Sequence, residues 1–410
     1  MKFQEIDALT FEKFANTQKR RSFEQTIEMG NLRKSRNFDV KYFALFHLEE
    51  IKVVALTYTQ KIFGGLNMGI YYGPIFSEER YLAHFLIELK KYTKKNNVLE
   101  LDIFPYDDYQ YYDDEGRLIQ DGNIELRDIF EKAGFTYQGD EVGFNSEQVT
   151  WHYVKDLTNL TSENLLNSFS KKGRPLVKKS NTFGIKVRKL NKDELQIFAN
   201  ITNDTATRRG YNDKGLEYYE KFFDAFKDKS EFTIATLNFR EYLGNILDGR
   251  HRLENKISIL GTRLDKNPNS EKIKNQLREL NSQRETFLIR EEEAKSFVKK
   301  YGDEDVVLAG SLFVYTQQEL VYLYSGSYVE FNKFYAPALL QEYAMLNALK
   351  KGIKFYNMLG ITGKFDNSDG VLCFKQNFKG YIVRKFSNFI YYPNPRKLKV
   401  IQLIKSILRR

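Results

Sequence analysis

Cysteine, histidine and proline are all scarce in this sequence of 410 residues. The single cysteine, Cys373, has no partner for an internal disulfide, so a reducing compartment fits best. The four histidines stand far apart, without cysteines at ligand spacing, which excludes a zinc finger or ribbon. We therefore expect no metal site. A Ser-His-Asp or Cys-His catalytic triad has no support in the sequence either.

Long apolar runs are missing as well. No segment approaches the roughly 20 apolar residues that a membrane-spanning helix requires. The first residues, MKFQEIDALTFEKF, carry acidic side chains where a signal peptide would be apolar. We therefore expect a cytoplasmic protein.

Three phosphate-binding motifs are absent. No G-x-x-x-x-G-K-[ST] loop exists, because Gly363-Lys364 lacks the upstream glycine, and nucleotide hydrolysis is therefore disfavoured. No G-x-G-x-x-G follows a predicted strand, which weakens the case for a dinucleotide site. The Arg/Gln-x-x-Gly-x-Gly/Ala turn with which acetyl-CoA acyltransferases hold a pyrophosphate is missing too.

Charged and aromatic residues, by contrast, are abundant. Lys and Arg number 64 against 54 Asp and Glu, which gives a net charge of +10 at pH 7. Aromatic residues make up 15% and charged residues 29%, a balance too apolar for disorder and too charged for a membrane bundle. The length allows two or three domains. The basic excess favours nucleic acid, an anionic leaflet or a phosphate-bearing substrate as partner.

One pattern occurs twice, about 255 residues apart. Met68–Pro74 and Val321–Ser327 are similar in form, and each precedes a helix that ends in paired lysines and then a strand. The helices are predicted at Glu79–Lys95 and Phe334–Lys351, and the strands at Val98–Phe104 and Ile353–Leu359. We predict two related α/β halves, with a coincidence between common α/β patterns as the alternative.

Residues 241–300 follow a heptad instead. The apolar series is Ile246, Leu253, Ile257, Leu260 and Leu264, then Ile273, Leu277, Leu280 and Phe287 after a turn containing proline. This spacing predicts an antiparallel coiled-coil hairpin. Each arm extends about 36 Å at 1.5 Å per residue. An arm that contacts a partner and a rigid structural insertion are equally open.

The densest basic segment is Lys171–Lys192, with nine Lys or Arg and no carboxylate in 22 residues. Charge of one sign at this density predicts a phosphate-binding surface, and a solvated loop with a helix end is the alternative. Further on, Arg208-Arg209-Gly210-Tyr211 offers two guanidiniums and a ring, which suit a diphosphate and a stacked base or sugar.

Lys375 lies between Phe374 and Phe378 and follows a glycine-rich segment. A lysine beside glycine loops could stabilise a developing oxyanion. The alternative is a charge at a strand edge, flanked by core residues.

Several short segments keep a fixed order along nearly the whole chain, with the predicted hairpin in its place among them. They are Phe23-Glu24-Gln25-Thr26, Pro105-Tyr106 to Tyr109-Gln110-Tyr111, Lys178-Lys179, Gly184-Ile185-Lys186-Val187-Arg188, Leu308-Ala309-Gly310, Phe355-Tyr356-Asn357 with Gly360, and Phe374-Lys375. In this order they resemble the Fem aminoacyltransferases of Gram-positive cell-wall synthesis. The resemblance is greatest to the MurM and MurN type, which branches the peptidoglycan stem peptide.

The resemblance implies an α/β (α+β) fold of two domains, each similar to a GNAT acyltransferase, with the coiled-coil hairpin inserted in the second. The expected ranges are 1–155 for the first domain, 156–240 with 301–385 for the second and 241–300 for the hairpin. Residues 386–410 are expected to pack back on the first domain.

The resemblance also implies a reaction. An amino acid, expected to be alanine with serine as the alternative, moves from the 3′ end of aminoacyl-tRNA to lipid II for interpeptide bridge synthesis. The acceptor is the amine of the stem-peptide lysine or of the residue already on it. No metal or organic cofactor is implied, and the missing CoA turn agrees because the donor is an RNA ester. A CoA-dependent N-acyltransferase and a non-enzymatic RNA-binding protein stay open as alternatives.

Site residues follow from matching positions. The resemblance implies that Lys375, with Phe374 beside it, stabilises the tetrahedral transition state, and that Arg33 and more weakly Arg208 hold acceptor phosphates. Tyr106 and Tyr211 are the further substrate-binding candidates. The expected tRNA-binding residues are Lys171, Lys172, Arg174, Lys178 and Lys179.

One departure concerns the general base. Where many relatives read Asp-Pro-Tyr, this chain reads Phe104-Pro105-Tyr106, so Asp102, Asp107 or a substrate group must take the proton. An α-amino group has a pKa near 8 and a lysine side chain one near 10.4, so deprotonating the former costs about 3 kcal/mol less. We therefore expect extension of an existing first residue to be easier than a start on lysine.

The C-terminal segment 396–410 has the pattern of an amphipathic helix. Val400, Ile401, Ile404 and Leu408 share one face, and the basic residues are Lys397, Lys399, Lys405, Arg409 and Arg410. Such a helix could make peripheral contact with the inner face of the membrane, near a lipid-linked acceptor. Packing on the first domain is the alternative and the preferred interpretation.

Overall fold

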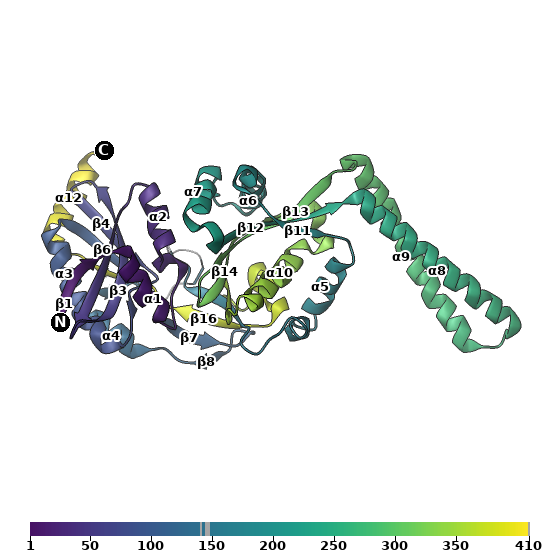
Figure 1. The fold of residues 1–410 in the computed structure, drawn as a ribbon, viewed down its shortest axis with the longest axis horizontal. Helices are drawn as coiled ribbons and strands as arrows, with labels where there is room; N and C mark the ends of the chain where they lie inside the picture. The colour runs from purple at the N-terminus through teal and green to yellow at the C-terminus, as the bar shows by residue number, and fades with distance from the viewer. Residues whose placement is uncertain (140–141, 144–147, 409–410) are drawn as a thin grey trace.

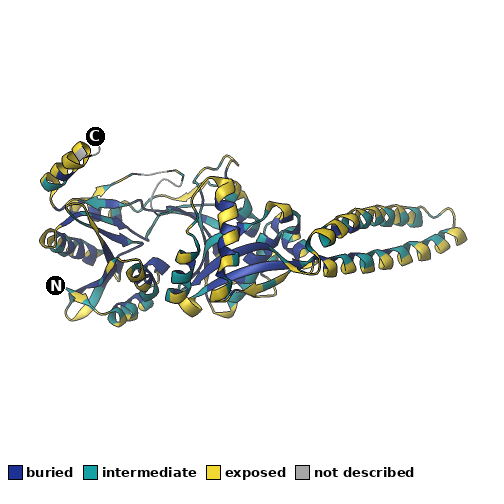
Figure 2. Ribbon diagram, turned by 90° about the horizontal axis from the view of Figure 1, so that it is seen from above, coloured by how far each residue is buried: buried dark blue, intermediate teal, exposed yellow. Residues whose placement is uncertain are grey.

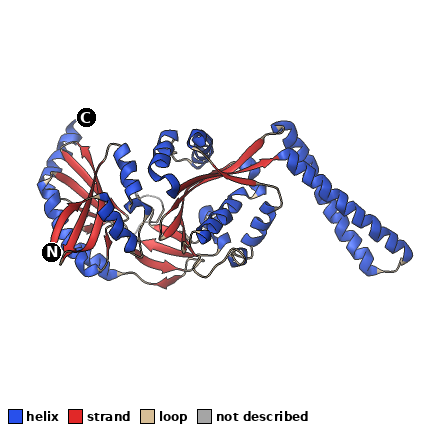
Figure 3. Cartoon of the chain, viewed as in Figure 1, coloured by secondary structure: helices blue, strands red, loops and turns tan. Residues whose placement is uncertain are grey.

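The computed structural model describes residues 1–139, 142–143 and 148–408. Its strands form two mixed sheets that lie side by side, and a long helical hairpin extends from the second (Figure 1). Figure 3 shows helices on both faces of each sheet. The predicted α/β class, with two sheets and a coiled-coil insertion, is confirmed.

The first sheet contains both parallel and antiparallel pairs. Its strand order is β1 (Lys2–Ile6), β2 (Asp39–His47), β3 (Glu50–Ile62), β4 (Gly65–Tyr71), β6 (Val98–Phe104), β17 (Phe389–Tyr391) and β9 (Thr136–Tyr137), with β5 (Ile75–Phe76) beside β3. Side chains of β2 alternate between two cores. Phe43 and Leu45 pack with α3 (Leu82–Lys95) and α4 (Ile124–Lys132), whereas Tyr42 and Ala44 pack with α1 (Ala8–Thr17).

The second sheet is larger. Its strand order is β11 (Lys186–Lys189), β12 (Ser230–Asn238), β13 (Asp305–Tyr315), β14 (Glu319–Ser327), β15 (Phe355–Gly360), β10 (Trp151–Asp156), β16 (Tyr381–Lys385), β7 (Asp108–Tyr112) and β8 (Leu118–Gln120). We call its two sides the α6 face and the α10 face. The α6 face packs with α2 (Ile27–Ser35), α6 (Leu195–Arg209) and α7 (Leu216–Phe226), and the α10 face with α5 (Gly173–Asn181), α10 (Ala336–Lys350) and α11 (Gly370–Lys375).

The chain crosses between the sheets at places that the expected ranges, 1–155 for the first domain and 156–240 with 301–385 for the second, do not anticipate. β7 and β8 lie in the second sheet, because β7 pairs with β16 from Ile382↔Tyr112 onward. Conversely, β17 inserts between β6 and β9 of the first sheet, where Phe389 stacks on Phe130 with ring centroids 4.3 Å apart. The two halves therefore exchange strands.

The repeated sequence pattern corresponds to two similar units. In each, a strand leads through a helix to a parallel neighbour, β4–α3–β6 in the first sheet and β14–α10–β15 in the second. β4 and β6 stay paired from Leu66↔Val98 to Tyr71↔Phe104. β14 and β15 pair only from Glu319↔Phe355 to Val321↔Asn357 and then diverge.

The hairpin consists of α8 (Phe239–Lys266) and α9 (Glu271–Tyr301). At its root, Phe239 stacks on Phe297 with ring centroids 4.4 Å apart, and Ile246 and Leu253 are buried. Figure 2 shows that the outer part is half-buried along one seam and exposed elsewhere. Two helices with no third neighbour can bury no more than this seam.

The C-terminal helix α12 (Pro395–Leu408) packs on the first sheet through few residues. Ile401 is buried and touches the backbone at Gly64, whereas Val400, Leu403, Ile404 and Ile407 are exposed. Arg409 and Arg410 lie outside the described residues. No helix of the described part of the chain is long and apolar enough to cross a membrane.

Candidate active site

Lys375 lies at the C-terminal end of α11, next to the part of β15 that follows its last pair with β14. Asp369 begins this helix by accepting hydrogen bonds from the backbone N–H groups of Val371 (2.8 Å) and Leu372 (3.1 Å). The buried Lys375 Nζ donates to the carbonyls of Leu359 (2.9 Å) and Gly360 (2.6 Å) on β15. Burial lowers the pKa of Lys375 to about 7, against the opposing charge of Asp369.

The donor count of Lys375 depends on its protonation. An ammonium group has three N–H donors. Two are used by the carbonyls of Leu359 and Gly360, and the described residues offer it no other hydrogen-bond acceptor. The protonated side chain therefore keeps one donor for a developing oxyanion, and the neutral side chain keeps none. Phe374 packs edge-on against Phe378, at 5.4 Å between ring centroids, and so stabilises this helix end.

The divergence opens a central strand to solvent. β14 lies between β13 and β15, and a strand in this position is normally buried on both sides. Nevertheless, the four residues Tyr322–Ser325 are half-buried, directly after the last pair with β15. The sheet is thus accessible beside Lys375.

The predicted tRNA-binding segment lies close to this opening. The backbone of Ser170, just before α5, donates to the carbonyl of Asn377 (3.0 Å), two residues after Lys375. Gly173 packs against the same carbonyl so closely that a Cβ would overlap it. Lys171, Lys172 and Lys178 are exposed, and Arg174 and Lys179 are half-buried.

Arg33 lies where the two halves meet. Its guanidinium pairs with Glu24 (3.1 Å) and stacks over the rings of Tyr58 (4.5 Å) and Tyr71 (5.3 Å). Burial lowers the pKa of Arg33, but the Glu24 carboxylate together with the Tyr58 and Tyr218 side chains outweighs this effect, and the pKa is raised overall. The buried Nε of Arg33 has no hydrogen-bond partner among the described residues.

The structure does not bring Arg208 or Tyr211 to these groups. Arg208 lines a cavity of about 570 Å³ at the root of the hairpin, with Tyr301 and Tyr328, and donates to the carbonyl of Ser327 (3.1 Å). Among the described residues, Arg208 shares no hydrogen-bond, ion-pair or ring partner with Arg33 or Lys375. Tyr211 is exposed in the loop after α6.

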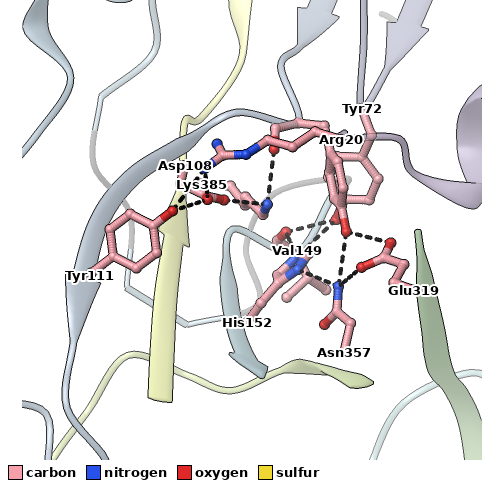
Figure 4. A network of polar contacts seen from close by, with 10 residues as sticks. Arg20, Tyr72, Asp108, Tyr111, Val149, His152, Glu319, Asn357 and Lys385 are labelled. Carbon is pink, nitrogen blue, oxygen red and sulfur yellow. Dashed lines mark hydrogen bonds and ion pairs between the residues drawn. The ribbon is translucent and has the colours of Figure 1, made fainter. Parts of the chain in front are cut away.

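A buried polar network joins the two halves on the α6 face (Figure 4). Tyr106, from the loop after β6, donates its hydroxyl to Glu319 Oε1 on β14 (2.6 Å). The Asn357 amide on β15 lies within hydrogen-bond distance of Tyr106 Oη (3.0 Å), His152 Nδ1 (3.1 Å) and Glu319 Oε2 (3.2 Å). Lys385 donates to the carbonyl of Tyr106 (2.9 Å).

Two members of this network have strongly shifted pKa values. Burial raises the pKa of Glu319 to about 7, although the hydrogen bond from Tyr106 acts in the opposite direction. Burial, with a smaller contribution from the charge of Lys385, lowers the pKa of His152 to about 3. The histidine is therefore neutral near pH 7, while the glutamate titrates there.

The two carboxylates that the sequence offers as bases differ in their surroundings. Asp102 accepts a hydrogen bond from the Asn388 amide (2.8 Å) within the first sheet. Asp107 lines a cavity of about 1080 Å³, which Tyr106 and Arg20 also line. Burial raises the pKa of Asp107 to about 6, against the opposing charge of Arg20. Asp107 thus borders this cavity, and Asp102 is held inside the sheet.

Sequence reasoning missed Glu319, Asn357 and His152. Each is a polar residue with an apolar or aromatic residue beside it in its strand, and most of its partners come from other elements of the fold. The available signal was Glu319 itself, because a carboxylate at the start of a buried strand requires a partner. The described residues contain no group of His, Cys, Asp and Glu that could hold a metal ion.

The fold defines a class of protein, the proteins built from two GNAT-like halves. A solved tandem GNAT protein from the clavulanic acid biosynthesis pathway has the same fold, with a TM-score of 0.51, 8% identity, and 96% and 99% of the two chains covered. The crystal structure of FemX gives a TM-score of 0.77 at 19% identity and covers 98% of this chain and 100% of that one.

The sequence comparisons identify the family. The FemAB family model matches residues 6–406, so the chain belongs to the FemAB family. Aminoacyltransferase FemA of Staphylococcus aureus strain N315 is 29% identical over 402 residues, which is 95% of each chain. FemA of strain MW2 matches over the same length with the same identity. The predicted resemblance is confirmed, and the chain is an enzyme of the aminoacyltransferase class.

Gly173 offers a test of the contact between α5 and the Lys375 helix. We expect Gly173→Ala to lower the free energy of unfolding by about 1–3 kcal/mol, because its methyl group would displace the Asn377 backbone. Gly370→Ala is the matched control: nothing lies within 4 Å of its Cβ, and alanine favours the helix by up to about 1 kcal/mol. Urea unfolding followed by circular dichroism measures both. Equal stability of the two variants would contradict the close packing.

Proposed function

We propose that this chain transfers an amino acid from aminoacyl-tRNA to an amine on the side-chain branch of the peptidoglycan precursor lipid II. The expected donor is alanyl-tRNA, with seryl-tRNA as the alternative. The observation that carries the proposal is Lys375, a buried lysine beside an opening in a GNAT-like sheet, with one N–H donor to spare when protonated. No metal or organic cofactor takes part in the proposed reaction.

The donor reaches the opening from the α10 face. The basic residues of the α5 segment lie next to the Lys375 helix and suit the phosphates at the 3′ end of an RNA. The helical hairpin, also on the second half, is long enough to contact the RNA further from its end. An aminoacyl ester carries its own activation, so the CoA pyrophosphate turn is not needed.

The acceptor reaches the opening from the α6 face, where the two halves meet. We assign an acceptor phosphate to Arg33, because its Nε has no hydrogen-bond partner among the described residues and the ion pair with Glu24 fixes the position of the guanidinium. Arg208 lies at the root of the hairpin and Tyr211 in the exposed loop after α6, both away from Arg33. We therefore assign this role to Arg33 alone. Tyr106 lines the cavity on the same side and is the second acceptor contact.

The chemistry is one acyl transfer. The acceptor nitrogen attacks the ester carbonyl, a tetrahedral oxyanion forms, and the bond to the ribose 3′ oxygen then breaks. Lys375 donates to the oxyanion, which stabilises the transition state more than the uncharged substrate. An α-amino acceptor is easier to deprotonate than a lysine side chain, which favours the second position of the branch.

The first test is mass spectrometry of lipid II after incubation with the chain and alanyl-tRNA. One acceptor has a bare stem lysine, and the other already carries one residue there. We expect alanine on the second acceptor in preference to the first. Transfer from acetyl-CoA in place of alanyl-tRNA, or no transfer from either alanyl-tRNA or seryl-tRNA, would contradict the proposal.

Lys375→Met tests the oxyanion role. It keeps the length of the side chain and removes its donors, so kcat falls by about 10²–10³-fold while KM for both substrates changes little. Lys364→Met, at an exposed lysine of the neighbouring loop, is the control and keeps wild-type rates. A Lys375→Met enzyme within threefold of the wild type would exclude Lys375 from the transition state.

We further propose that α12 rests on the inner face of the membrane that holds lipid II. Leu403 and Ile407 are exposed on one side of the helix, which also carries Lys397, Lys399 and Lys405. We expect sedimentation with phosphatidylglycerol vesicles, weaker in high salt, and none with phosphatidylcholine. The double variant Leu403→Ser, Ile407→Ser loses it, whereas Ile259→Ser, at an exposed residue of the hairpin, does not. Unchanged sedimentation of the double variant would contradict the contact.

A further inference from the structure

The reaction needs a group that takes a proton from the attacking amine, and Phe104 stands where a carboxylate is expected. In the structure, Tyr106, two residues after Phe104, is hydrogen-bonded to a carboxylate from the other half of the chain. Glu319 opens β14, and its Oε1 accepts the hydroxyl hydrogen bond of Tyr106. Glu319 and Tyr106 are both buried.

We propose that Glu319 takes up the proton of the acceptor amine through the hydroxyl of Tyr106, and so replaces the carboxylate missing at Phe104. Glu319 touches Tyr106 and not the substrate, so it is a positioning residue for Tyr106. The assignment rests on the proposed function and adds the path of the proton to it.

The hydrogen bonds of Tyr106 leave room for the amine. A phenol oxygen donates one hydrogen bond and accepts up to two. Tyr106 donates to Glu319 and accepts from Asn357 (3.0 Å), so one acceptor position remains. Tyr106 also lines the cavity of about 1080 Å³, which gives a ligand access to this residue.

The remaining charges of the network are paired. Lys385 lies over the Tyr106 ring (3.8 Å) and pairs with Asp108 (2.5 Å), and Arg20 pairs with Asp108 as well (2.7 Å). The hydroxyl of Tyr72, also buried here, donates to the carbonyl of Val149 (2.7 Å). His152 stays neutral, since its pKa is lowered to about 3. Glu319, with a pKa raised to about 7, is thus the member that changes charge near neutrality.

The network is also connected to Lys375. Asn357, which bonds to Glu319 and Tyr106, accepts a hydrogen bond from the backbone N–H of Leu359 (2.9 Å). The carbonyl of the same Leu359 is one of the two acceptors of Lys375. Glu319 and Lys375 are therefore both hydrogen-bonded to one short segment of β15, from Asn357 to Gly360. This segment begins where the pairing of β15 with β14 ends.

The proton balance of the step closes within the reacting groups. As the C–N bond forms, the amine proton passes to Tyr106 Oη, and the Tyr106 hydroxyl proton passes to Glu319. As the ester C–O bond breaks, the ribose 3′ oxygen leaves as an alkoxide and receives one proton. Glu319 returns its proton through Tyr106, so the enzyme ends as it began, with an amide and an alcohol as products.

The test is the pH dependence of kcat for alanine transfer at saturating acceptor, for the wild type, Glu319→Gln and Tyr106→Phe. The wild-type profile should rise up to about pH 7 as Glu319 ionises, and fall above it as Lys375 loses its proton. Glu319→Gln and Tyr106→Phe should lower kcat by about 100-fold, leave KM nearly unchanged, and remove the rising limb. Glu319→Asp should recover part of the rate together with the limb.

Glu231→Gln is the matched control, since Glu231 is a buried glutamate of the same sheet that pairs with Lys189. It should keep the rising limb. Should Glu319→Gln fail to fold, Tyr106→Phe carries the test, because it keeps the ring and removes only the hydroxyl.

Three results would overturn the assignment. They are a Glu319→Gln or Tyr106→Phe enzyme within threefold of the wild type, a lower rate with the rising limb unchanged, and loss of the limb in Asp107→Asn but not in Glu319→Gln. Absence of transfer by the wild-type chain would overturn the proposed function itself, and this assignment with it.

Discussion

Backbone carbonyl groups in the middle of a sheet need hydrogen-bond donors, and β15 loses those of β14 after Asn357. Beyond that point Lys375 donates hydrogen bonds to two carbonyls of β15, those of Leu359 and Gly360. A buried cation is expensive to desolvate, and the lowered pKa of Lys375 reflects this. The half-buried part of β14 and the end of α11, against which the start of α5 packs, both lie at this divergence. A pair as fully matched as β4 and β6 would have neither an opening nor a use for the lysine.

The two halves are joined by strands as well as by side chains. β7 completes the second sheet, β17 completes the first, and Tyr106 reaches across to Glu319. Hydrogen-bonded strands hold their neighbours far more tightly than a flexible linker would. The distance between Arg33, at the junction of the halves, and Lys375, on the second sheet, is thus set by the sheets themselves. For a reaction between two large substrates, this fixed geometry removes one source of disorder.

The sequence predicted what depends on local pattern. The heptad gave the hairpin, and the repeated strand, helix and strand gave the two parallel units, because period and helix ends are encoded by neighbouring residues. It did not predict that β7 pairs with β16, since strand exchange depends on partners about 270 residues apart. The site divides in the same way. Lys375 stood out from its glycine and aromatic neighbours in the sequence. Glu319 belongs to the buried network only through hydrogen bonds with Tyr106 and Asn357, which are remote in sequence.

The hairpin is continuous with two central strands of the second sheet. α8 begins at Phe239, directly after β12, and α9 ends at Tyr301, just before β13. With 28 residues in α8, the tip stands about 40 Å from the sheet. The Phe239–Phe297 stack anchors the two helices at the root of the hairpin. A force on the tip of the hairpin would therefore be transmitted to β12 and β13. β13 is the strand that pairs with β14 on the side away from the opening.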